Sequence, residues 1–276
     1  MSTDVFEVSD LTLLWDVDRE LLKRLRIPIM VAGFKITGNA ATYYLKESIE
    51  DAERAFRLYS HFFPPVTTVD GDKFSIIHEE LWFSRTKHLY IYRGEGTERL
   101  QGYRGVLSPD ASAFLYKYAM NLVRICKDLG IREIYTLGSV TPVRYEGAVH
   151  VAFYSDSHKK IPEGARRIER RGVDAFFIEG EDALLPGFAS ASGIECYTLM
   201  AEERHFLDLR ASITALEAFR EMSGIDIDME KVRKIAKSDI EQFEKRIKEY
   251  QRRLMDSSSA TTGTGERHRI GSSIYL

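Results

Sequence analysis

An almost unbroken apolar run, Ile27–Phe34 (IPIMVAGF), is the feature that most constrains how this chain can fold. A strand with apolar side chains on both faces belongs at the centre of a sheet that is covered on both sides. Arg132–Ser139 and Gly193–Glu202 repeat this composition, and segments with apolar residues at helical spacing lie between the runs. Strands that alternate with helices over short connections predict an α/β fold, a three-layer α/β/α sandwich.

The remaining elements follow from the same patterns. Ser108 and Pro109 suit the cap and the first position of a helix that Gly130 would end. The predicted strands are Ile27–Phe34, Phe74–His78, Glu80–Arg85, His88–Gly94, Arg132–Ser139, His150–Ser157, Val173–Gly180 and Gly193–Glu202. The predicted helices are Ala40–Phe56, Pro109–Leu129, Glu163–Gly172 and Leu207–Gly224.

Residues 226–256 have a different pattern from the body of the chain, residues 1–225. Apolar residues recur every three or four positions from Met229 to Leu254, with one irregular step, which predicts a helix of about 45 Å. A stripe this narrow fits either a last helix packed on its own domain or a protruding helix that pairs with another copy. For the second alternative, the predicted contact residues are Val232, Phe243, Ile247, Tyr250 and Leu254.

The overall composition argues against several classes of protein. A net charge of -3 gives no basic excess for nucleic acid, and no uncharged apolar run reaches the roughly 18 residues of a membrane span. The acidic start MSTDVFEVSD lacks the apolar core of a signal peptide, and Cys126 and Cys196 are predicted to be buried and reduced, so a cytoplasmic location is expected. Two asparagines and three glutamines beside 29% charged residues indicate a thermophile, with chance bias as the alternative.

No segment carries a complete catalytic motif. The turn GFKITGNAA has backbone amides that could hold an anion, but it matches neither the dinucleotide fingerprint nor a Walker loop, and close packing is the alternative explanation. Ser139 ends a strand without the G-x-S-x-G sequence of a nucleophile elbow. Glu202, Glu203 and His205 could do acid–base work or lie at a solvated loop edge. The histidines form no zinc motif and Arg166–Arg171 has no interleaved aromatics, so no catalytic residue, metal or cofactor is predicted.

Several segments, in this order, resemble the archaeal branch of the proteasome assembly chaperone family: VAGFKITGNAATYYLKE, HLYIYRGEG, EIYTLGSV, GIECYTLMAEE and LDLRASITALEAF. The resemblance extends from about Leu11 to Met255. It implies a sandwich like that of phosphorylases and peptidyl hydrolases, generally without known catalysis, and proteins that bind proteasome α-subunits. Relatives often carry another glycine just after the Gly-Asn turn, where this chain has Ala40-Ala41, and this departure weakens the case for a ligand site at the turn.

The resemblance also suggests a role for the end of the chain. Residues 257–276 are predicted to be a flexible polar tail, yet they end in Ile274, Tyr275 and Leu276. These match the hydrophobic-Tyr-any (HbYX) tripeptide of proteasome activators, which inserts between adjacent α-subunits of the core particle. The resemblance therefore implies that Ile274 fills an apolar patch, that Tyr275 buries its ring and hydrogen-bonds through its hydroxyl, and that Leu276 supplies its terminal carboxylate to a lysine.

Together these features predict a non-enzymatic, ATP-independent proteasome assembly chaperone or activator, a homo-oligomer in which several weak tails act together. Two alternatives stay open. One is a phosphorylase- or hydrolase-like enzyme for nucleosides or nucleotides with a pocket near Gly33, Asn39 and Ser139. The other is an adaptor whose helical stripe binds an unrelated partner. The sequence fixes neither the number of copies in the oligomer nor the choice between assembly and activation.

Overall fold

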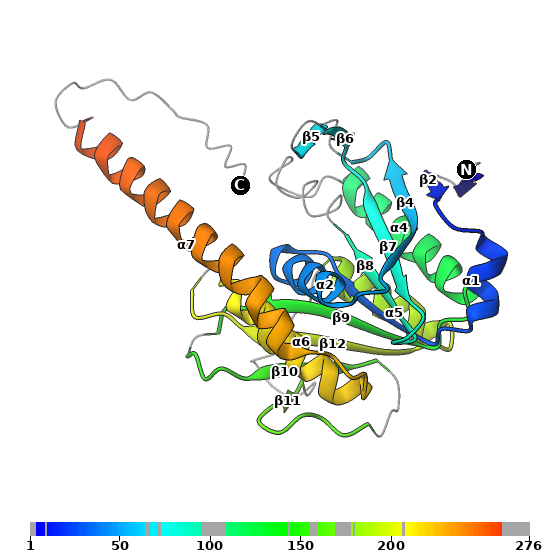
Figure 1. Cartoon of the computed structure of the whole chain (residues 1–276). Coiled ribbons are helices and arrows are strands. Elements are labelled where there is room, and N and C mark those ends of the chain that lie inside the picture. Colours follow the sequence, from blue (N-terminus) through cyan, green and yellow to red (C-terminus); the bar gives the residue numbers. More distant parts are fainter. Residues whose placement is uncertain are drawn as a thin grey trace.

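The computed structural model describes residues 4–8, 10–63, 67–70, 73–94, 109–142, 144–154, 159–168, 178, 180–205 and 208–260. A twisted central sheet lies between two layers of helices, and one long helix, α7, extends away from this body (Figure 1). The predicted three-layer α/β/α sandwich is confirmed.

Within the described residues, ten strands form the main sheet in the order β1-β2-β4-β7-β8-β3-β9-β12-β10-β11. Its strands are β1 (Asp4–Val8), β2 (Leu11–Trp15), β3 (Ile29–Gly33), β4 (Glu53–Ser60), β7 (Glu79–Ser84), β8 (Leu89–Arg93), β9 (Glu133–Val140), β10 (Val149–Phe153), β11 (Arg166–Arg167) and β12 (Glu195–Glu202). A separate hairpin consists of β5 (Thr67–Asp70) and β6 (Lys73–Ile76).

The centre of the sheet is parallel and its flanks are largely antiparallel. Strand β3 runs parallel to both β8 and β9, so that Val31 lies beside Ile91 on one side and Tyr135 on the other. Strand β12 extends the parallel block next to β9. The apolar run Ile27–Phe34 therefore lies at the centre of the sheet, where a strand with apolar side chains on both faces is expected.

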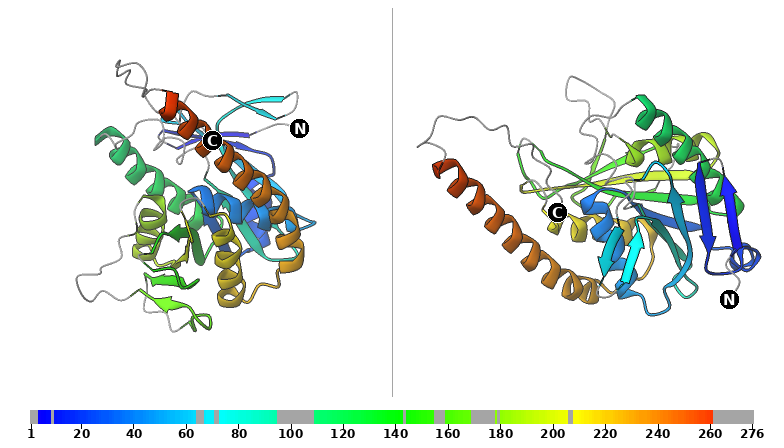
Figure 2. Two further views of the ribbon diagram at one scale, coloured as in Figure 1. Left: turned by 90° about the vertical axis from the view of Figure 1, so that its left-hand side faces the viewer. Right: turned by 90° about the horizontal axis from the view of Figure 1, so that it is seen from above.

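The two helical layers cover opposite faces of this sheet (Figures 1 and 2). The helices are α1 (Arg19–Leu25), α2 (Ile36–Ser48), α4 (Pro109–Asp128), α5 (Glu181–Ala191), α6 (Arg210–Ser223) and α7 (Met229–Ala260). Met30 and Ala32 of β3 belong to the core with α1, α4 and α5, whereas Val31 belongs to the core with α2, α6 and α7. Successive side chains of a strand point to opposite faces, so one central strand supplies both cores.

Several predicted elements are confirmed by the structure. Helix α4 ends close to Gly130, and α6 ends at Gly224, whose left-handed backbone (φ 70°) suits glycine. Cys126 and Cys196 are both buried and free, and burial raises the pKa of the Cys126 thiol to about 12. Among the described helices, none has an apolar stretch long enough to cross a bilayer.

Other predicted elements are wrong. The helix expected to reach Phe56 ends at Ser48, and Glu53–Ser60 is strand β4 between β2 and β7. The basic helix expected at Glu163–Gly172 is not formed in its described part, where Arg166 pairs beside His150 as strand β11. In both cases the segment pairs with neighbouring strands of the sheet, and this pairing determined its structure in spite of its helix propensity. The strand expected at Val173–Gly180 lies mostly outside the described residues.

Some elements had no clear signal in the sequence. Strands β1, β2 and β4 and helix α1 were not predicted, and α5 was missed because Pro186 and Gly187 interrupt its pattern. Pro186 nevertheless lies inside the helix and is buried beside the α4 layer.

Helix α7 has 32 residues, which corresponds to about 48 Å. Met229, Val232, Ala236 and Ile240 are buried against the body, in one core with α2 and α6. Beyond Phe243, the described side chains of α7 are not buried, and the helix leaves the body (Figures 1 and 2). The first half of α7 thus packs on its own domain and the second half protrudes, and the pairing of this helix with another copy stays a prediction.

Candidate functional site

The glycines of the β3–α2 connection have a packing role. A Cβ atom at Gly33 would clash with the backbone of Gly38, and one at Gly38 would clash with the carbonyl oxygen of Leu137. Glycine at both positions lets the start of α2 lie directly against β3 and β9. These contacts favour the close-packing explanation of the GFKITGNAA turn.

Ser139 lies in a closed cluster of hydrogen bonds at the carboxyl end of β9. Its hydroxyl is 2.5 Å from the Glu203 carboxylate and 2.9 Å from Thr37 Oγ1, and Thr37 donates to the same Glu203 oxygen at 2.9 Å. Thr37 and Glu203 are buried. Within the described residues, the hydrogen-bond partners of Ser139 are these two side chains, so its neighbours do not include the imidazole base of a serine nucleophile.

Glu202 and Glu203 do not converge on one site. Glu202 instead accepts hydrogen bonds from His150 Nε2 (2.9 Å) and from the backbone amides of Glu146 (2.7 Å) and Ala148 (3.2 Å). Burial raises the pKa of Glu202, but these donors outweigh it and leave the pKa below its ordinary value. The acid–base arrangement is therefore divided between two networks, and the solvated-edge interpretation is wrong for both carboxylates, since both are buried.

Asp182, at the start of α5, is the most unusual carboxylate in the described structure. It is fully buried, and neither of its carboxylate oxygens has a hydrogen-bond partner. Burial raises its pKa to about 7, with a smaller opposing effect of Lys35 and a further increase from Glu181. No pattern in the sequence pointed to this residue, because an acid in the first turn of a helix is ordinarily solvated.

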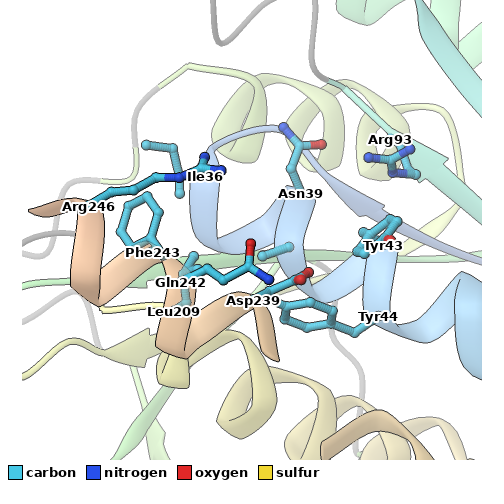
Figure 3. A pocket seen from close by; sticks show the side chains of 11 residues that line it. Ile36, Asn39, Tyr43, Tyr44, Arg93, Leu209, Asp239, Gln242, Phe243 and Arg246 are labelled. Carbon is cyan, nitrogen blue, oxygen red and sulfur yellow. The ribbon is translucent and has the colours of Figure 1, made fainter. Parts of the chain in front are cut away.

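A groove lies between α2 and α7 (Figure 3). It is an open groove with a volume of about 400 Å³. Its aromatic side chains come from Tyr43 and Tyr44 of α2 and Phe243 of α7, and Ala40 and Leu209 contribute apolar surface. The groove lies where α7 leaves the body, just beyond the last buried residue of that helix, Ile240.

Charged groups occur along the groove. Arg93 lies over the Tyr43 ring at 5.3 Å and pairs with Glu80 at 3.3 Å. Arg246 lies toward the other end, and Asp239 lies between the two arginines (Figure 3). Within the described residues, neither Asp239 nor Arg246 has a hydrogen bond or an ion pair. Of the residues named for a possible pocket, Asn39 lines this groove and Gly33 and Ser139 do not. The lining residues of α7 were not predicted, because α2 and α7 are far apart along the chain.

The residues predicted for pairing between copies fall into three groups. Val232 is fully buried in its own domain, so its side chain cannot form a contact with another copy. Phe243 is half-buried and lines the groove. The side chains of Ile247, Tyr250 and Leu254, and the whole of Ile274–Leu276, lie outside the described residues. In the part of the chain that the structure describes, no three metal-ligating side chains come together.

Comparison with known proteins assigns the chain to a family. The sequence model of the PAC2 family matches residues 33–251. The chain belongs to the PAC2 family. This PAC2 protein is 27% identical, over 235 residues, to an uncharacterized protein of Methanocaldococcus jannaschii, with 83% of this chain and 84% of that protein covered.

Two solved structures from Pyrococcus furiosus are similar to the PAC2 protein in fold. PbaB, described as an archaeal proteasome activator, has a TM-score of 0.63 and 19% identity, with 86% of this chain and 99% of PbaB covered. PbaA, described as an archaeal homolog of proteasome-assembly chaperone, has a TM-score of 0.58 and 18% identity, with coverage of 86% and 95%. At these identities the likeness establishes the shared fold.

Some of the features described above lie inside the family match and others lie outside it. The match begins at Gly33 and ends at Gln251, so it includes Asp182, the groove and the strand-end cluster, the hydrogen-bonded group of Thr37, Ser139 and Glu203. The terminal tripeptide lies outside it. The predicted family resemblance is therefore confirmed for the body of the PAC2 protein, while the HbYX tail stays a prediction from the sequence.

Proposed function

We propose that this PAC2 protein is a non-catalytic proteasome assembly chaperone or activator that binds the proteasome core particle through Ile274, Tyr275 and Leu276. The observation that carries the proposal is the course of α7, which leaves the body at Phe243 and leads toward the end of the chain (Figure 1). The PAC2 family match and the similar folds of PbaB and PbaA support it.

The chemistry of the tripeptide suits insertion between two α-subunits. Ile274 would fill an apolar patch, Tyr275 would bury its ring with its hydroxyl hydrogen-bonded, and the carboxylate of Leu276 would pair with a lysine of the pocket. Sixteen residues separate Ala260 from the end of the chain, and fully extended they would reach at most about 55 Å. The tripeptide could therefore bind at up to this distance from the end of α7.

Multivalency would strengthen this binding. One tripeptide buries little surface, but several tails on one homo-oligomer raise the effective concentration of each tail after the first has bound. Phe243, Ile247, Tyr250 and Leu254 on the outer half of α7 are the proposed contacts between copies. Occupied pockets would stabilise paired α-subunits during assembly, or favour an open gate if the tail binds that state more tightly.

The decisive experiment removes the tripeptide from the full chain. Deletion of Ile274–Leu276 should abolish binding to purified core particle in a pull-down and leave the thermal unfolding temperature unchanged. Tyr275→Ala should weaken binding by about tenfold or more, because a buried aromatic anchor with a bonded hydroxyl is lost. Ser273→Ala, next to the tripeptide, is the matched control and should bind like wild type. Equal binding of the truncated and intact proteins would refute the proposal.

The same proteins separate assembly from activation. If the tail acts on the finished particle, adding the PAC2 protein should speed cleavage of a fluorogenic peptide by preassembled core particle. If it acts during assembly, it should instead raise the yield of particles from separate α- and β-subunits. In either case the deleted protein should have no effect.

A further inference from the structure

A basic hollow of about 460 Å³ lies where α1 and α4 end and where β3 and β9 begin. Three of its lining residues are cations, Lys23, Arg26 and Arg132. Of the described lining residues, only Asp128 is acidic, and its carboxylate pairs with Arg19 at 2.7 Å and with Lys23 at 3.3 Å. The positive charges of Arg26 and Arg132 are therefore not neutralised within the hollow.

The backbone at both arginines is specific. Arg26 follows α1 in the left-handed conformation (φ 50°, ψ 43°), which is uncommon for a residue with a Cβ atom and which suits glycine better. Arg132 donates its amide to the carbonyl oxygen of Pro28 at 2.8 Å, and its own carbonyl accepts from the amide of Glu195 at 3.0 Å. Strained backbone of the kind found at Arg26 occurs mostly at functional sites, which points to a use for its side chain.

Helix dipoles do not account for these two arginines. A helix C-terminus attracts cations, but α1 already has two basic residues in its last turn and α4 has one. Two of the last carbonyl groups of α4 accept from the amides of Gly130 and Ile131, at 3.1 and 2.9 Å. In the part of the chain that the structure describes, the side chains of Arg26 and Arg132 make no hydrogen bond or ion pair. Their guanidinium groups are thus available to a ligand.

We infer that this basic hollow binds a small anion with more than one phosphate group, such as pyrophosphate. The planar forks of Arg26 and Arg132 match phosphate oxygens, and Lys23 adds a further positive charge. Apart from Asp128, the other described lining residues are a proline, a leucine and a glycine, so the hollow offers a nucleobase no aromatic surface on which to stack. Its volume leaves room for more than one phosphate group.

The basic hollow is remote from the proposed proteasome contacts. Helix α1 lies on the opposite side of the body from the outer half of α7 (Figures 1 and 2). The inference therefore goes beyond the proposed function and does not depend on it. An anion that contacts Arg26 and Arg132 together would connect the end of α1 to the start of β9, and it should raise the thermal unfolding temperature, because it binds the folded chain.

Isothermal titration calorimetry of the full chain at constant ionic strength tests the binding. Pyrophosphate should bind about tenfold or more tightly than orthophosphate or sulfate, because it can contact both guanidinium groups at once. No detectable binding of pyrophosphate up to millimolar concentration would overturn the inference. So would equal binding of sulfate, which would make the hollow an adventitious anion site, or tighter binding of a glutamate-rich peptide, which would make it a contact for another protein.

The variant Arg26→Gly separates binding from folding. It removes the guanidinium group but suits the left-handed backbone, so pyrophosphate affinity should fall by about tenfold or more while the thermal unfolding temperature does not fall. Arg24→Ala removes the same charge two residues away, outside the hollow, and should bind pyrophosphate like wild type. Equal loss in both variants, or unchanged binding in Arg26→Gly, would overturn the site. Deletion of Ile274–Leu276 should leave pyrophosphate binding unchanged, so failure of tail docking and failure of this site are distinguishable.

Discussion

The first half of α7 and its outer half carry the same kind of apolar stripe but are held differently. In the first half, Val232, Ala236 and Ile240 are buried against α2 and α6. In the outer half, beyond Phe243, the described side chains are not buried, although the three- and four-residue spacing continues to Leu254. The spacing sets which face of a helix is apolar, but the extent of the body decides how much of that face is covered.

The largest effect on stability is expected in the covered half. Val232→Asp places a carboxylate where the side chain has no exposed surface, and should lower the free energy of unfolding by about 3 kcal/mol or more. Urea denaturation followed by circular dichroism measures this. Lys234→Asp, exposed on the same half of α7, is the control and should change stability by less than about 0.5 kcal/mol. Similar stability of the two variants would contradict the packing.

A second test concerns Asp182, a buried carboxylate of the body without a hydrogen-bond partner. The raised pKa of Asp182, about 7 against an ordinary 3.8, means that its contribution to stability is fully present below pH 3.8 and lost as the pH rises through about 7. Asp182→Asn should therefore gain about 2 to 3 kcal/mol relative to wild type between about pH 5 and about pH 8. Thermal unfolding across this range measures the difference.

The control for Asp182 is an exposed carboxylate. The side chain of Asp226 is 97% exposed, so Asp226→Asn should show a nearly constant difference from wild type over the same pH range. A constant difference for Asp182→Asn as well would mean that Asp182 is hydrated or paired in solution.

A smaller effect is expected at the strand-end cluster. Ser139→Ala removes one donor to the buried Glu203 carboxylate and should cost about 1 to 2 kcal/mol of stability. Binding to the core particle should not change, because the cluster connects α2 to β9 and the proposed binding residues are those of the terminal tripeptide. Ser238→Ala, an exposed serine of α7, is the control for thermal unfolding. Loss of core-particle binding in Ser139→Ala would contradict the purely structural role of this residue.

The smallest effect on stability is expected in the outer half of α7. Lys248→Asp changes an exposed side chain and should alter the free energy of unfolding by less than about 0.5 kcal/mol. The measurement should be repeated at two protein concentrations. A larger effect that grows with concentration would show that this half is covered by another copy in solution.

Much of the fold could be predicted from local patterns. The Ile27–Phe34 run predicted a central strand, and β3 lies between β8 and β9. The spacing of apolar residues gave a wrong prediction at β4, where a segment with helical spacing forms a strand of the sheet. Strand pairing depends on partners elsewhere in the chain, which the local spacing does not show.

The sites were less predictable. Ser139 and Asn39 could be found as polar residues near the carboxyl ends of predicted strands, but their partners could not. Thr37 and Glu203 meet Ser139 across 102 and 64 residues of sequence. The groove is harder still, because no pattern links its lining residues on α2 with those on α7, and they come to line one groove only after α7 packs on α2.

The sequence by itself determined the alternation of strands and helices, the apolar face of α7 and the chemistry of the last three residues. Only the tertiary structure decided how far α7 is covered, that Asp182 is buried without a partner, and that Glu202 and Glu203 belong to separate networks. The physical reason is the range of each effect. Side-chain period and residue chemistry are local, whereas burial and the pKa of a carboxylate depend on residues far away in the chain.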